Sequence, residues 1–223
     1  MKKIVVALDG FSGTGKSSTA KKVADALHYI YIDSGAMYRA TTYFMLANEV
    51  NLDDHDAVAA SLEGVDIQFL GSQILLNGTN VSNEIRTMRI NENVSKVSAI
   101  RQVREAMVAQ QQQIGRERGI VMDGRDIGTV VFPDAELKVF MTANPRVRAL
   151  RRQKELLEKG IEEELNTIEL NLLERDKIDS SRAESPLIKA DDAVEIDTSD
   201  LTFDEQVHKI VELAKEIIHA DRD

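Results

Sequence analysis

The fold is decided by Gly10-Phe11-Ser12-Gly13-Thr14-Gly15-Lys16-Ser17, which matches the pattern G-x-x-x-x-G-K-[ST] at every fixed position. The apolar run Ile4–Leu8 before it predicts a buried strand, and the amphipathic spacing of Lys16–Leu27 predicts a helix after it. Glycines here let the backbone approach a phosphate group closely, while backbone N–H groups and the helix N-terminus attract the negative charge. The sequence therefore predicts a loop that binds the phosphates of a nucleoside triphosphate.

Two side chains of the loop and one later carboxylate are candidates for the chemistry of that ligand. Lys16 is expected to reach the β and γ phosphates, and the hydroxyl of Ser17 to bind the Mg²⁺ ion that accompanies them. Asp123 directly follows the apolar run Ile120–Met122 and is expected to hold the same ion through a water molecule. We therefore expect Mg²⁺ as the cofactor, with Ser17 and Asp123 at the metal site.

The rest of the chain alternates apolar runs with helical patterns, which is typical of an α/β fold with a parallel sheet. The expected strands are Ile4–Leu8, Tyr29–Ile32, Ile120–Met122, Leu137–Thr142 and Ala193–Ile196. The expected helices are Lys16–Leu27, Ala36–Asn48, Asn91–Arg118, Pro145–Lys159, Glu162–Asp176 and Phe203–His219.

One segment, Leu62–Ile90, breaks this rhythm. Val65–Phe69 alternates apolar and polar residues with a period of two, and Ile74–Leu76 is a second short apolar run. Gly71-Ser72 and Asn77-Gly78 are turn sequences on either side of that run. We therefore expect a small antiparallel unit inserted into the parallel fold.

The composition of the chain excludes several classes of protein. Its 223 residues carry 28 Lys and Arg against 38 Asp and Glu, and the formal net charge of −10 argues against a surface that binds nucleic acid or anionic lipid. Cysteine is absent, so disulfides and thiolate metal sites are excluded and a reducing compartment is favoured. No apolar run approaches the roughly 20 residues of a membrane span. We expect a cytoplasmic monomer without nucleic-acid or membrane partners.

Several arginines stand where phosphate could meet them. Arg39 lies one turn into a helix that begins beside the phosphate loop, and Arg125-Asp126 closely follows the third predicted strand. Arg148 and Arg152 are four residues apart on one helical face, an arrangement that favours an anion between the two like charges. Each of these residues also has a plainer interpretation, as a solvated arginine or as part of a local ion pair.

The residues leave several activities open. A nucleotide-binding loop serves a GTPase switch, a mechanical ATPase, a small-molecule kinase or a nucleotide sensor without chemistry. Thr142–Arg146 stands where a GTPase would carry an N-K-x-D segment and lacks it. Arg175, Asp179 and Arg182 share one helical face, and from the residues alone an intrahelical ion pair is the favoured interpretation.

The order and spacing of the motifs resemble the bacterial-type cytidylate kinases over nearly the whole chain. The most specific run is Asp123–Pro133, which reads Asp-Gly-Arg-Asp-Ile-Gly-Thr-Val-Val-Phe-Pro. The others are Gly10–Ser17, Asp33-Ser34-Gly35 with Tyr38-Arg39, Glu84-Ile85-Arg86, Val103-Arg104-Glu105, and Arg175-Asp176 with Asp179 and Arg182. Phe11 departs from the proline that the family often has, and Ser17-Ser18 from the Gly-Thr of some members.

The resemblance implies a fold and a subdivision of the chain. The fold is that of a P-loop NTPase, with a five-stranded parallel sheet flanked by helices, a small antiparallel insertion that binds the nucleoside monophosphate, and a short lid. The single kinase chain would divide into a core of residues 1–61, 91–145 and 161–223, the insertion at 62–90 and the lid at 146–160.

The resemblance also implies an activity, the transfer of the γ-phosphoryl group of ATP to CMP or dCMP, giving ADP and CDP or dCDP, in pyrimidine nucleotide metabolism. The implied catalytic residues are Lys16, Arg125, Arg148 and Arg152. The implied ATP-binding residues are Gly10, Phe11, Ser12, Gly13, Thr14, Gly15, Lys16, Ser17, Ser18, Arg148 and Arg152. The implied CMP-binding residues are Ser34, Tyr38, Arg39, Ser95, Arg104, Arg125, Asp126, Arg175, Asp179 and Arg182.

The resemblance also implies which part of the acceptor nucleotide each of these CMP-binding residues would contact. Asp126 and Arg104 would read the edge of the cytosine. Ser95, Asp179 and Arg175 would hold the sugar, and Arg39 and Arg125 would hold the phosphate.

Overall fold

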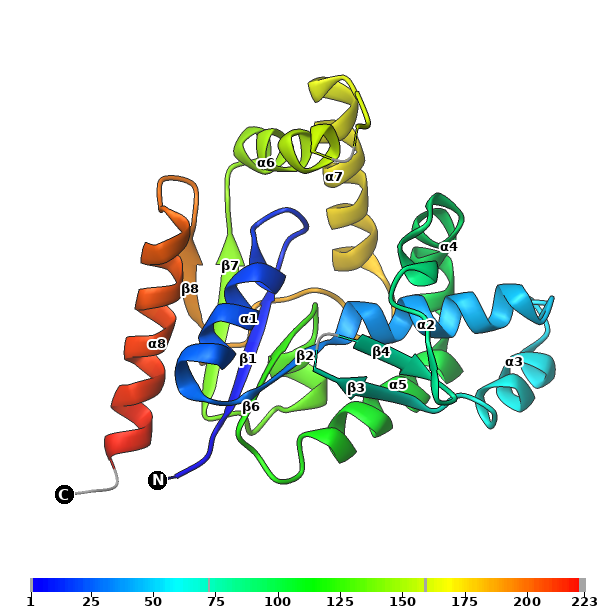
Figure 1. Cartoon of the computed structure of the whole chain (residues 1–223), viewed down its shortest axis with the longest axis horizontal. Coiled ribbons are helices and arrows are strands. Elements are labelled where there is room, and N and C mark those ends of the chain that lie inside the picture. Colours follow the sequence, from blue (N-terminus) through cyan, green and yellow to red (C-terminus); the bar gives the residue numbers. More distant parts are fainter. Residues whose placement is uncertain (1, 72, 159, 221–223) are drawn as a thin grey trace. The chain divides into compact units, whose positions relative to one another are not determined.

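A computed structural model describes residues 2–71, 73–158 and 160–220 of the chain (Figure 1). The chain forms two compact units. The first consists of the residues up to Ile32 together with those from Glu117 onward, and the second of Asp33–Arg116.

The first unit contains a five-stranded sheet in the order β2-β6-β1-β7-β8. Its strands are β1 (Val5–Gly10), β2 (Ile30–Asp33), β6 (Ile120–Asp123), β7 (Leu137–Thr142) and β8 (Val194–Asp197). β1 pairs in parallel with both β6 and β7, and β7 pairs in parallel with β8. The predicted parallel sheet is confirmed. The strand predicted at Leu137–Thr142 has the observed bounds, and the ends of the others differ from the observed ones by at most two residues.

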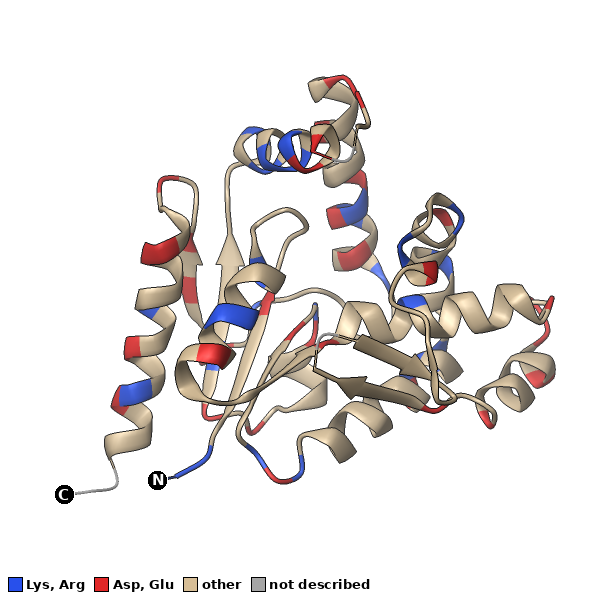
Figure 2. Cartoon of the chain, in the orientation of Figure 1, with Lys and Arg blue, Asp and Glu red and all other residues tan. Residues whose placement is uncertain are grey.

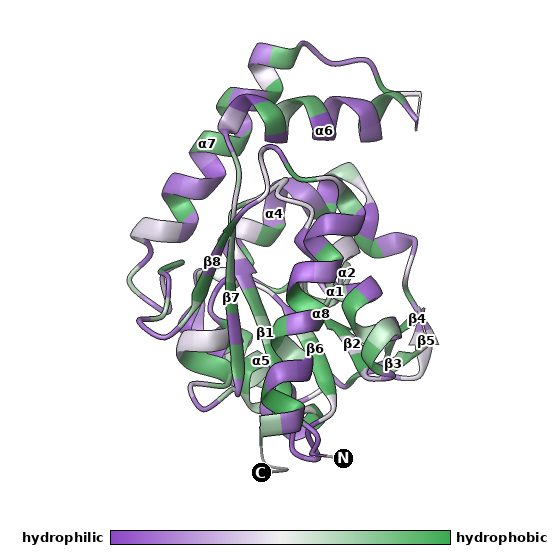
Figure 3. Ribbon diagram, turned by 90° about the vertical axis from the view of Figure 1, so that its left-hand side faces the viewer, coloured by the Kyte–Doolittle hydropathy of each residue, from purple (hydrophilic) through white to green (hydrophobic). Residues whose placement is uncertain are grey.

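Helices α1 (Lys16–Leu27) and α8 (Phe203–His219) pack against the sheet through apolar stripes that match its apolar strands. Helices α6 (Pro145–Leu157) and α7 (Leu165–Ser181) pack on each other through Ala149, Ile168 and Leu172, and a short π-helical turn η2 spans Ile127–Val131. Val23 of α1 and Ile210 of α8 are buried in one cluster with Val6 and Leu8 of β1. Figure 3 shows these apolar strands and the polar outer face of α8. This core fixes the end of β1, from which the phosphate loop emerges.

The second unit consists of helices and a small three-stranded sheet in the order β3-β4-β5. Its elements are α2 (Ser34–Ala47), α3 (His55–Leu62), β3 (Ile67–Leu70), β4 (Gln73–Leu76), β5 (Thr79–Asn80), the 3-10 turn η1 (Glu84–Arg86), α4 (Met88–Ser98) and α5 (Arg101–Ile114). The strands pair antiparallel, as expected for this segment. Asn77 and Gly78 join β4 to β5 with φ of 51° and 78°, the left-handed backbone that a tight hairpin turn needs. Ser72, in the other predicted turn, lies outside the described residues.

Some predicted helices are wrong in extent. The single helix predicted at 91–118 is two helices, because Ile100 takes extended backbone (φ −72°, ψ 125°) between α4 and α5. Helix α3 was not predicted, although Asp54 gives it a capping carboxylate that accepts hydrogen bonds from Asp56 N and Ala57 N. α7 begins at Leu165 and continues to Ser181, beyond the predicted 162–176. Lys159, the predicted end of the helix that begins at Pro145, lies outside the described residues. The division into core, insertion and lid stays a prediction.

Candidate active site

The phosphate loop follows β1 and depends on two glycines with unusual backbone. Gly10 has φ of 141°, and a Cβ atom built on it would overlap the carbonyl oxygen of Met141 on β7. Gly15 has φ of 89° and stands in left-handed backbone as the N-cap of α1. Only glycine accepts both the left-handed torsion and the close neighbour without strain. The loop that the sequence predicts between strand and helix is therefore present.

Lys16 folds back over the loop. Its Nζ donates a hydrogen bond to the carbonyl oxygen of Phe11 at 2.6 Å, and the residue is 5% exposed. Burial and then the charge of Arg125 hold the pKa of Lys16 well below its usual value, although Asp123 and Asp9 act in the opposite direction. A phosphate bound in the loop would supply the anion that these two cations favour.

Ser17 and Asp123 come together as the sequence predicts. The Ser17 hydroxyl donates to Asp123 Oδ2 at 2.7 Å, and the Tyr31 hydroxyl donates to Asp123 Oδ1 at 2.8 Å. Ser17 is exposed, whereas Asp123 is 4% exposed. The described residues hold no group of three or more His, Cys, Asp and Glu that could cage a metal ion. A hydroxyl beside one carboxylate fits Mg²⁺, which usually takes few protein oxygens and completes its shell with water and phosphate.

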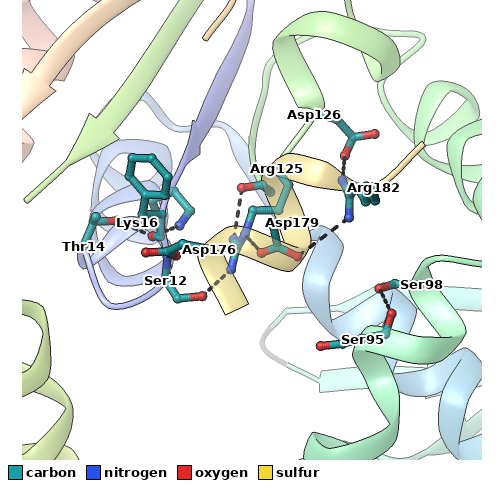
Figure 4. A network of polar contacts seen from close by, with 12 residues as sticks. Ser12, Thr14, Lys16, Ser95, Ser98, Arg125, Asp126, Asp176, Asp179 and Arg182 are labelled. Carbon is teal, nitrogen blue, oxygen red and sulfur yellow. Dashed lines mark hydrogen bonds and ion pairs between the residues drawn. The ribbon is translucent and has the colours of Figure 1, made fainter. Parts of the chain in front are cut away.

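Ser12 is the point where several elements meet the loop. Its hydroxyl accepts a hydrogen bond from Arg125 NH2 at 2.7 Å, while Arg125 Nε donates to Asp179 Oδ2 at 2.7 Å (Figure 4). Its backbone N–H donates to Asp176 Oδ1 at 3.3 Å, and its carbonyl accepts from Arg148 NH1 at 3.0 Å. Ser12 of the phosphate loop is thus joined to the segment after β6 and to helices α6 and α7.

Arg148 is buried and hydrogen-bonded within this network, and is not exposed on the surface of its helix. It is 3% exposed, forms an ion pair with Asp176 Oδ2 at 2.5 Å, and its guanidinium lies 5.4 Å from the centre of the Phe11 ring. Arg152, which the sequence places on the same face, pairs with Glu155 at 3.1 Å and its side chain is 38% exposed. Figure 2 shows the Lys and Arg residues that gather on α6. The two arginines therefore have different environments, and the anion beside Arg148 is a carboxylate of the protein.

The cluster predicted on α7 also reaches the end of β6. Arg182 lies 3.7 Å from Asp126 Oδ1 and 3.9 Å from Asp179 Oδ1, and its Nε donates to the carbonyl of Ser185 at 2.7 Å. Asp126, Asp179 and Arg182 are thus brought together with Arg125 within the first unit (Figure 4). Arg175, predicted in the same group, lies on the exposed surface of α7.

Several polar residues of this network were missed from the sequence. Asp9 is 5% exposed, and its two carboxylate oxygens accept hydrogen bonds from Ile127 N at 2.9 Å and Gly128 N at 2.7 Å. Burial raises the pKa of Asp9 to about 6, against the lowering effect of those two backbone bonds. An acid at the end of a buried strand was the available signal, since such strands rarely bury a charge without a partner.

Arg151 and Asp176 were also missed. Arg151 donates to the carbonyls of Thr198 at 2.6 Å and Thr14 at 3.3 Å, and so joins α6 to the loop after β8 and to the phosphate loop. Arg151 stands in the same run as Arg148 and Arg152, and Asp176 stands beside Arg175. Helical spacing alone does not tell which members of such runs turn inward.

The remaining predicted acceptor residues belong to the second unit. Ser34 begins α2, capped by Asp33, whose Oδ1 accepts from Ala36 N at 2.8 Å. Arg39 NH2 pairs with Asp33 Oδ2 at 3.1 Å, and the Arg39 side chain is 24% exposed. The structure therefore holds Arg39 by an ion pair one and a half helical turns from the start of α2.

Tyr38, Ser95 and Arg104 come from three helices of the same unit. Arg104 on α5 is 3% exposed, its guanidinium lies 5.3 Å from the centre of the Tyr38 ring, and NH1 donates to the carbonyl of Ser98 at 3.1 Å. Ser95 on α4 accepts from Ser98 Oγ through its carbonyl at 3.1 Å (Figure 4). Within this unit Arg104 and Tyr38 are in contact, as a cation over an aromatic face.

Comparison with known proteins places these motifs in a family. A family model described as "Cytidylate kinase" matches residues 6–216. The chain is 51% identical to a cytidylate kinase of Cytophaga hutchinsonii over 220 residues, covering 96% of this chain and 94% of the relative. It is 49% identical to a cytidylate kinase of Flavobacterium psychrophilum over 226 residues, covering 97% and 100%.

Among solved structures, a shikimate kinase from Bacteroides thetaiotaomicron aligns with a TM-score of 0.50 at 12% identity, covering 98% of this chain and 99% of that one. A protein from Eubacterium ventriosum titled as uncharacterized aligns with a TM-score of 0.53 at 14% identity, covering 96% and 99%. At these identities the likeness concerns the fold alone.

Proposed function

This chain belongs to the cytidylate kinase family, and from that premise we propose how its own residues transfer the γ-phosphoryl group of ATP to CMP or dCMP. The products are ADP and CDP or dCDP, and the enzyme is a transferase whose acceptor is a phosphate group. The observation that carries the proposal is the phosphate loop with a buried lysine, joined through Ser12 to the arginine that follows β6.

The donor ATP is assigned to the loop and to α6. Its phosphates would lie against the backbone of Gly10–Ser18, with Lys16 on the β and γ groups and Arg148 and Arg152 as further cations. Ser17 and, through water, Asp123 would hold Mg²⁺. When bound, the ion neutralises phosphate charge and orients the β and γ oxygens. Arg148 would exchange part of its pairing with Asp176 for the triphosphate, because both anions suit the same guanidinium.

The acceptor CMP is assigned to the residues that the family resemblance implies. Arg39 and Arg125 would bind its phosphate, and Ser95, Asp179 and Arg175 its sugar. Asp126 and Arg104 would read the cytosine, because a carboxylate accepts from the exocyclic amine while a guanidinium donates to the ring acceptors. Ser34, Tyr38 and Arg182 complete the proposed set.

The chemistry needs little from the protein besides position and charge. The acceptor phosphate is already ionised near pH 7, so no side chain has to remove a proton from it. Two polyanions must instead be brought end to end, and the arginines offset their repulsion. Closure of the predicted lid, which carries Arg148 and Arg152, over the γ phosphate would keep water away from it, since hydrolysis is the competing reaction.

Location and assembly form part of the same proposal. We propose a cytoplasmic monomer that acts on free nucleotides and binds neither nucleic acid nor membrane. The absence of cysteine and the negative net charge support this proposal. No helix among the described residues has the length and hydropathy to cross a lipid bilayer.

The test is a coupled assay of ADP release with CMP, dCMP, UMP, AMP and no acceptor. Rapid turnover is expected with CMP and dCMP, and slower turnover with UMP, because uracil presents a carbonyl where Asp126 would accept a hydrogen bond. The substitution Asp126→Ala is expected to reduce the ratio of kcat/KM for CMP over UMP by about tenfold, the equivalent of one hydrogen bond to a charged group.

A matched control is Asp134→Ala, which removes an exposed carboxylate paired with Arg118 and leaves the ratio unchanged. ATP hydrolysis that is independent of any acceptor would indicate a nucleotidase or switch instead. Binding without turnover would indicate a sensor. Equal rates with CMP and UMP in the wild-type enzyme would refute the base-reading role of Asp126.

A further inference from the structure

Tyr31 is a residue of the donor side to which the proposed function gives no role. It lies on β2, which neighbours β6 in the sheet, and its hydroxyl donates to Asp123 Oδ1 at 2.8 Å. The other oxygen, Oδ2, accepts from the Ser17 hydroxyl at 2.7 Å. The Asp123 carboxylate is therefore held at both oxygens, by groups from β2 and from α1.

Two bonds of this kind restrict the carboxylate more than either would alone. The terminal torsion of an aspartate has a broad energy minimum, so one hydrogen bond leaves its plane free to turn. Donors on both oxygens, placed by two separate elements, fix that plane. Because Asp123 is 4% exposed, water competes little for these bonds.

The fixed orientation of the Asp123 carboxylate in turn fixes the direction of the Ser17 hydroxyl. As long as the Ser17 hydroxyl hydrogen points at Asp123, the lone pairs of its oxygen are left for another partner. A hydroxyl that donates to a fixed carboxylate can therefore offer its oxygen to a cation without having to turn. Groups that orient metal ligands in this way raise metal affinity although they never touch the metal.

We infer that Tyr31 is a positioning residue for Mg²⁺, acting through Asp123 and Ser17. This inference rests on the proposed metal site, since Tyr31 has nothing to position if Ser17 and Asp123 do not hold the ion. Tyr31 makes no contact with nucleotide in this role, and its effect is confined to how tightly the ion is held.

A plainer role for the Tyr31 hydroxyl is to tie β2 to β6, and Tyr29 provides the control for that role. The Tyr29 hydroxyl also makes hydrogen bonds within the first unit, accepting from Ile4 N at 3.2 Å and donating to the carbonyl of Lys2 at 3.5 Å. Tyr29→Phe thus removes a phenol hydroxyl two residues away in the chain. That hydroxyl makes two hydrogen bonds to the backbone and does not contact Asp123.

The experiment titrates Mn²⁺, a spectroscopic substitute for Mg²⁺, into the full-length enzyme saturated with ADP, and follows free Mn²⁺ by electron paramagnetic resonance. Tyr31→Phe is expected to weaken Mn²⁺ binding to the enzyme–ADP complex by about tenfold, the lower end of the range for lost outer-shell partners. Tyr29→Phe is expected to leave it unchanged. ADP affinity in the presence of EDTA should be the same in all three proteins.

A double variant separates positioning from packing. Asp123→Asn removes the charge through which Tyr31 acts, so adding Tyr31→Phe to it should cause no further loss of Mn²⁺ affinity. Thermal unfolding of each variant without ligand checks that the chain is folded. If Tyr31→Phe does not fold, Tyr31→His, which keeps a ring N–H donor on a shorter side chain, is titrated in its place and should weaken Mn²⁺ binding less than Asp123→Asn does.

Three results would overturn the inference. They are unchanged Mn²⁺ binding in Tyr31→Phe, an equal loss of ADP affinity in EDTA, or an undiminished effect of Tyr31→Phe in the Asp123→Asn background. A wild-type complex that holds Mn²⁺ no more tightly than free ADP does would remove the metal role of Ser17 and Asp123 together with that of Tyr31. Kinase activity with CMP would survive any of these results, so the proposed function fails or stands on the separate nucleotide assay.

Discussion

The two units of this chain treat charge in opposite ways. Among the described residues, the first unit buries Asp9, Lys16, Asp123, Asp126, Lys138, Arg148 and Asp176. In the described part of Asp33–Arg116, the buried charged side chain is Arg104, which lies over the ring of Tyr38. The first unit thus brings both signs of charge inside, and the second keeps its carboxylates near solvent.

The difference teaches how each unit is prepared for a phosphate. A buried cation costs free energy unless an anion accompanies it, and for Arg148 the carboxylate of Asp176 fills that place before any nucleotide arrives. Under the proposed assignment, ATP would compete with carboxylates for guanidinium groups that are already aligned. In the second unit Arg39 is partly exposed, so the phosphate proposed to bind there would compete mainly with water and with Asp33. In the first unit the arginine side chains are ordered before any nucleotide binds, whereas in the second unit a bound phosphate would neutralise a partly exposed charge.

The largest effect expected from this contrast is on stability. Asp176→Ala leaves the 3% exposed Arg148 without its carboxylate, and should lower the free energy of unfolding by about 3 kcal/mol. Asp33→Ala removes the carboxylate partner of the partly exposed Arg39 and a helix cap, and should cost about 1 kcal/mol. Urea unfolding of both variants measures the difference. A larger loss in Asp33→Ala than in Asp176→Ala would reverse the contrast between the units.

The next effect is on turnover. Lys16→Ala removes the loop cation that would meet the γ phosphate, and kcat should fall by at least about 10²-fold, the scale of one lost charge stabiliser. Arg39→Ala, in the second unit, should act chiefly by raising the KM for CMP. Steady-state kinetics with both substrates varied measures both effects. Near-normal turnover in Lys16→Ala would contradict its assigned role.

The smallest effect is a pH dependence that the buried carboxylate of Asp9 imposes on the first unit. The folded-state pKa of Asp9 is raised from the ordinary 3.8 to about 6, so between these values the folded protein binds more protons than the unfolded chain. Stability contributed by this group is therefore present at low pH and lost as the pH rises towards 6. Wild-type protein should lose about 1 kcal/mol relative to Asp9→Asn between pH 5 and pH 6.

Urea unfolding of both proteins at each pH measures that difference, and the subtraction cancels the other titrating groups. If the free energies of unfolding of the two proteins changed with pH in parallel, ionisation of the buried Asp9 carboxyl would not destabilise the folded state. If the wild-type protein instead became more stable relative to Asp9→Asn as the pH rises, the two backbone hydrogen bonds to Asp9 would outweigh the free-energy cost of burying its charge.

Local pattern determined much of this protein. The loop Gly10–Ser17, the strand before it and the helix after it follow from residues that are neighbours in the chain, because backbone torsion, helix periodicity and phosphate binding are local properties. The same holds for the turn at Asn77-Gly78. The run Asp123–Pro133 was the most specific part of the resemblance to the cytidylate kinases.

Only the tertiary structure decided which charged residues turn inward. The Ser12 N–H reaches Asp176 across 164 positions, and Asp9 holds Ile127 N across 118. Arg148 is buried while Arg152, on the same predicted face, is partly exposed. Sequence spacing gives the face of a helix but not what the rest of the chain packs against it. Burial and partner choice are properties of contacts between distant segments, and for that reason Asp9, Tyr31, Arg151 and Asp176 emerged only from the folded chain.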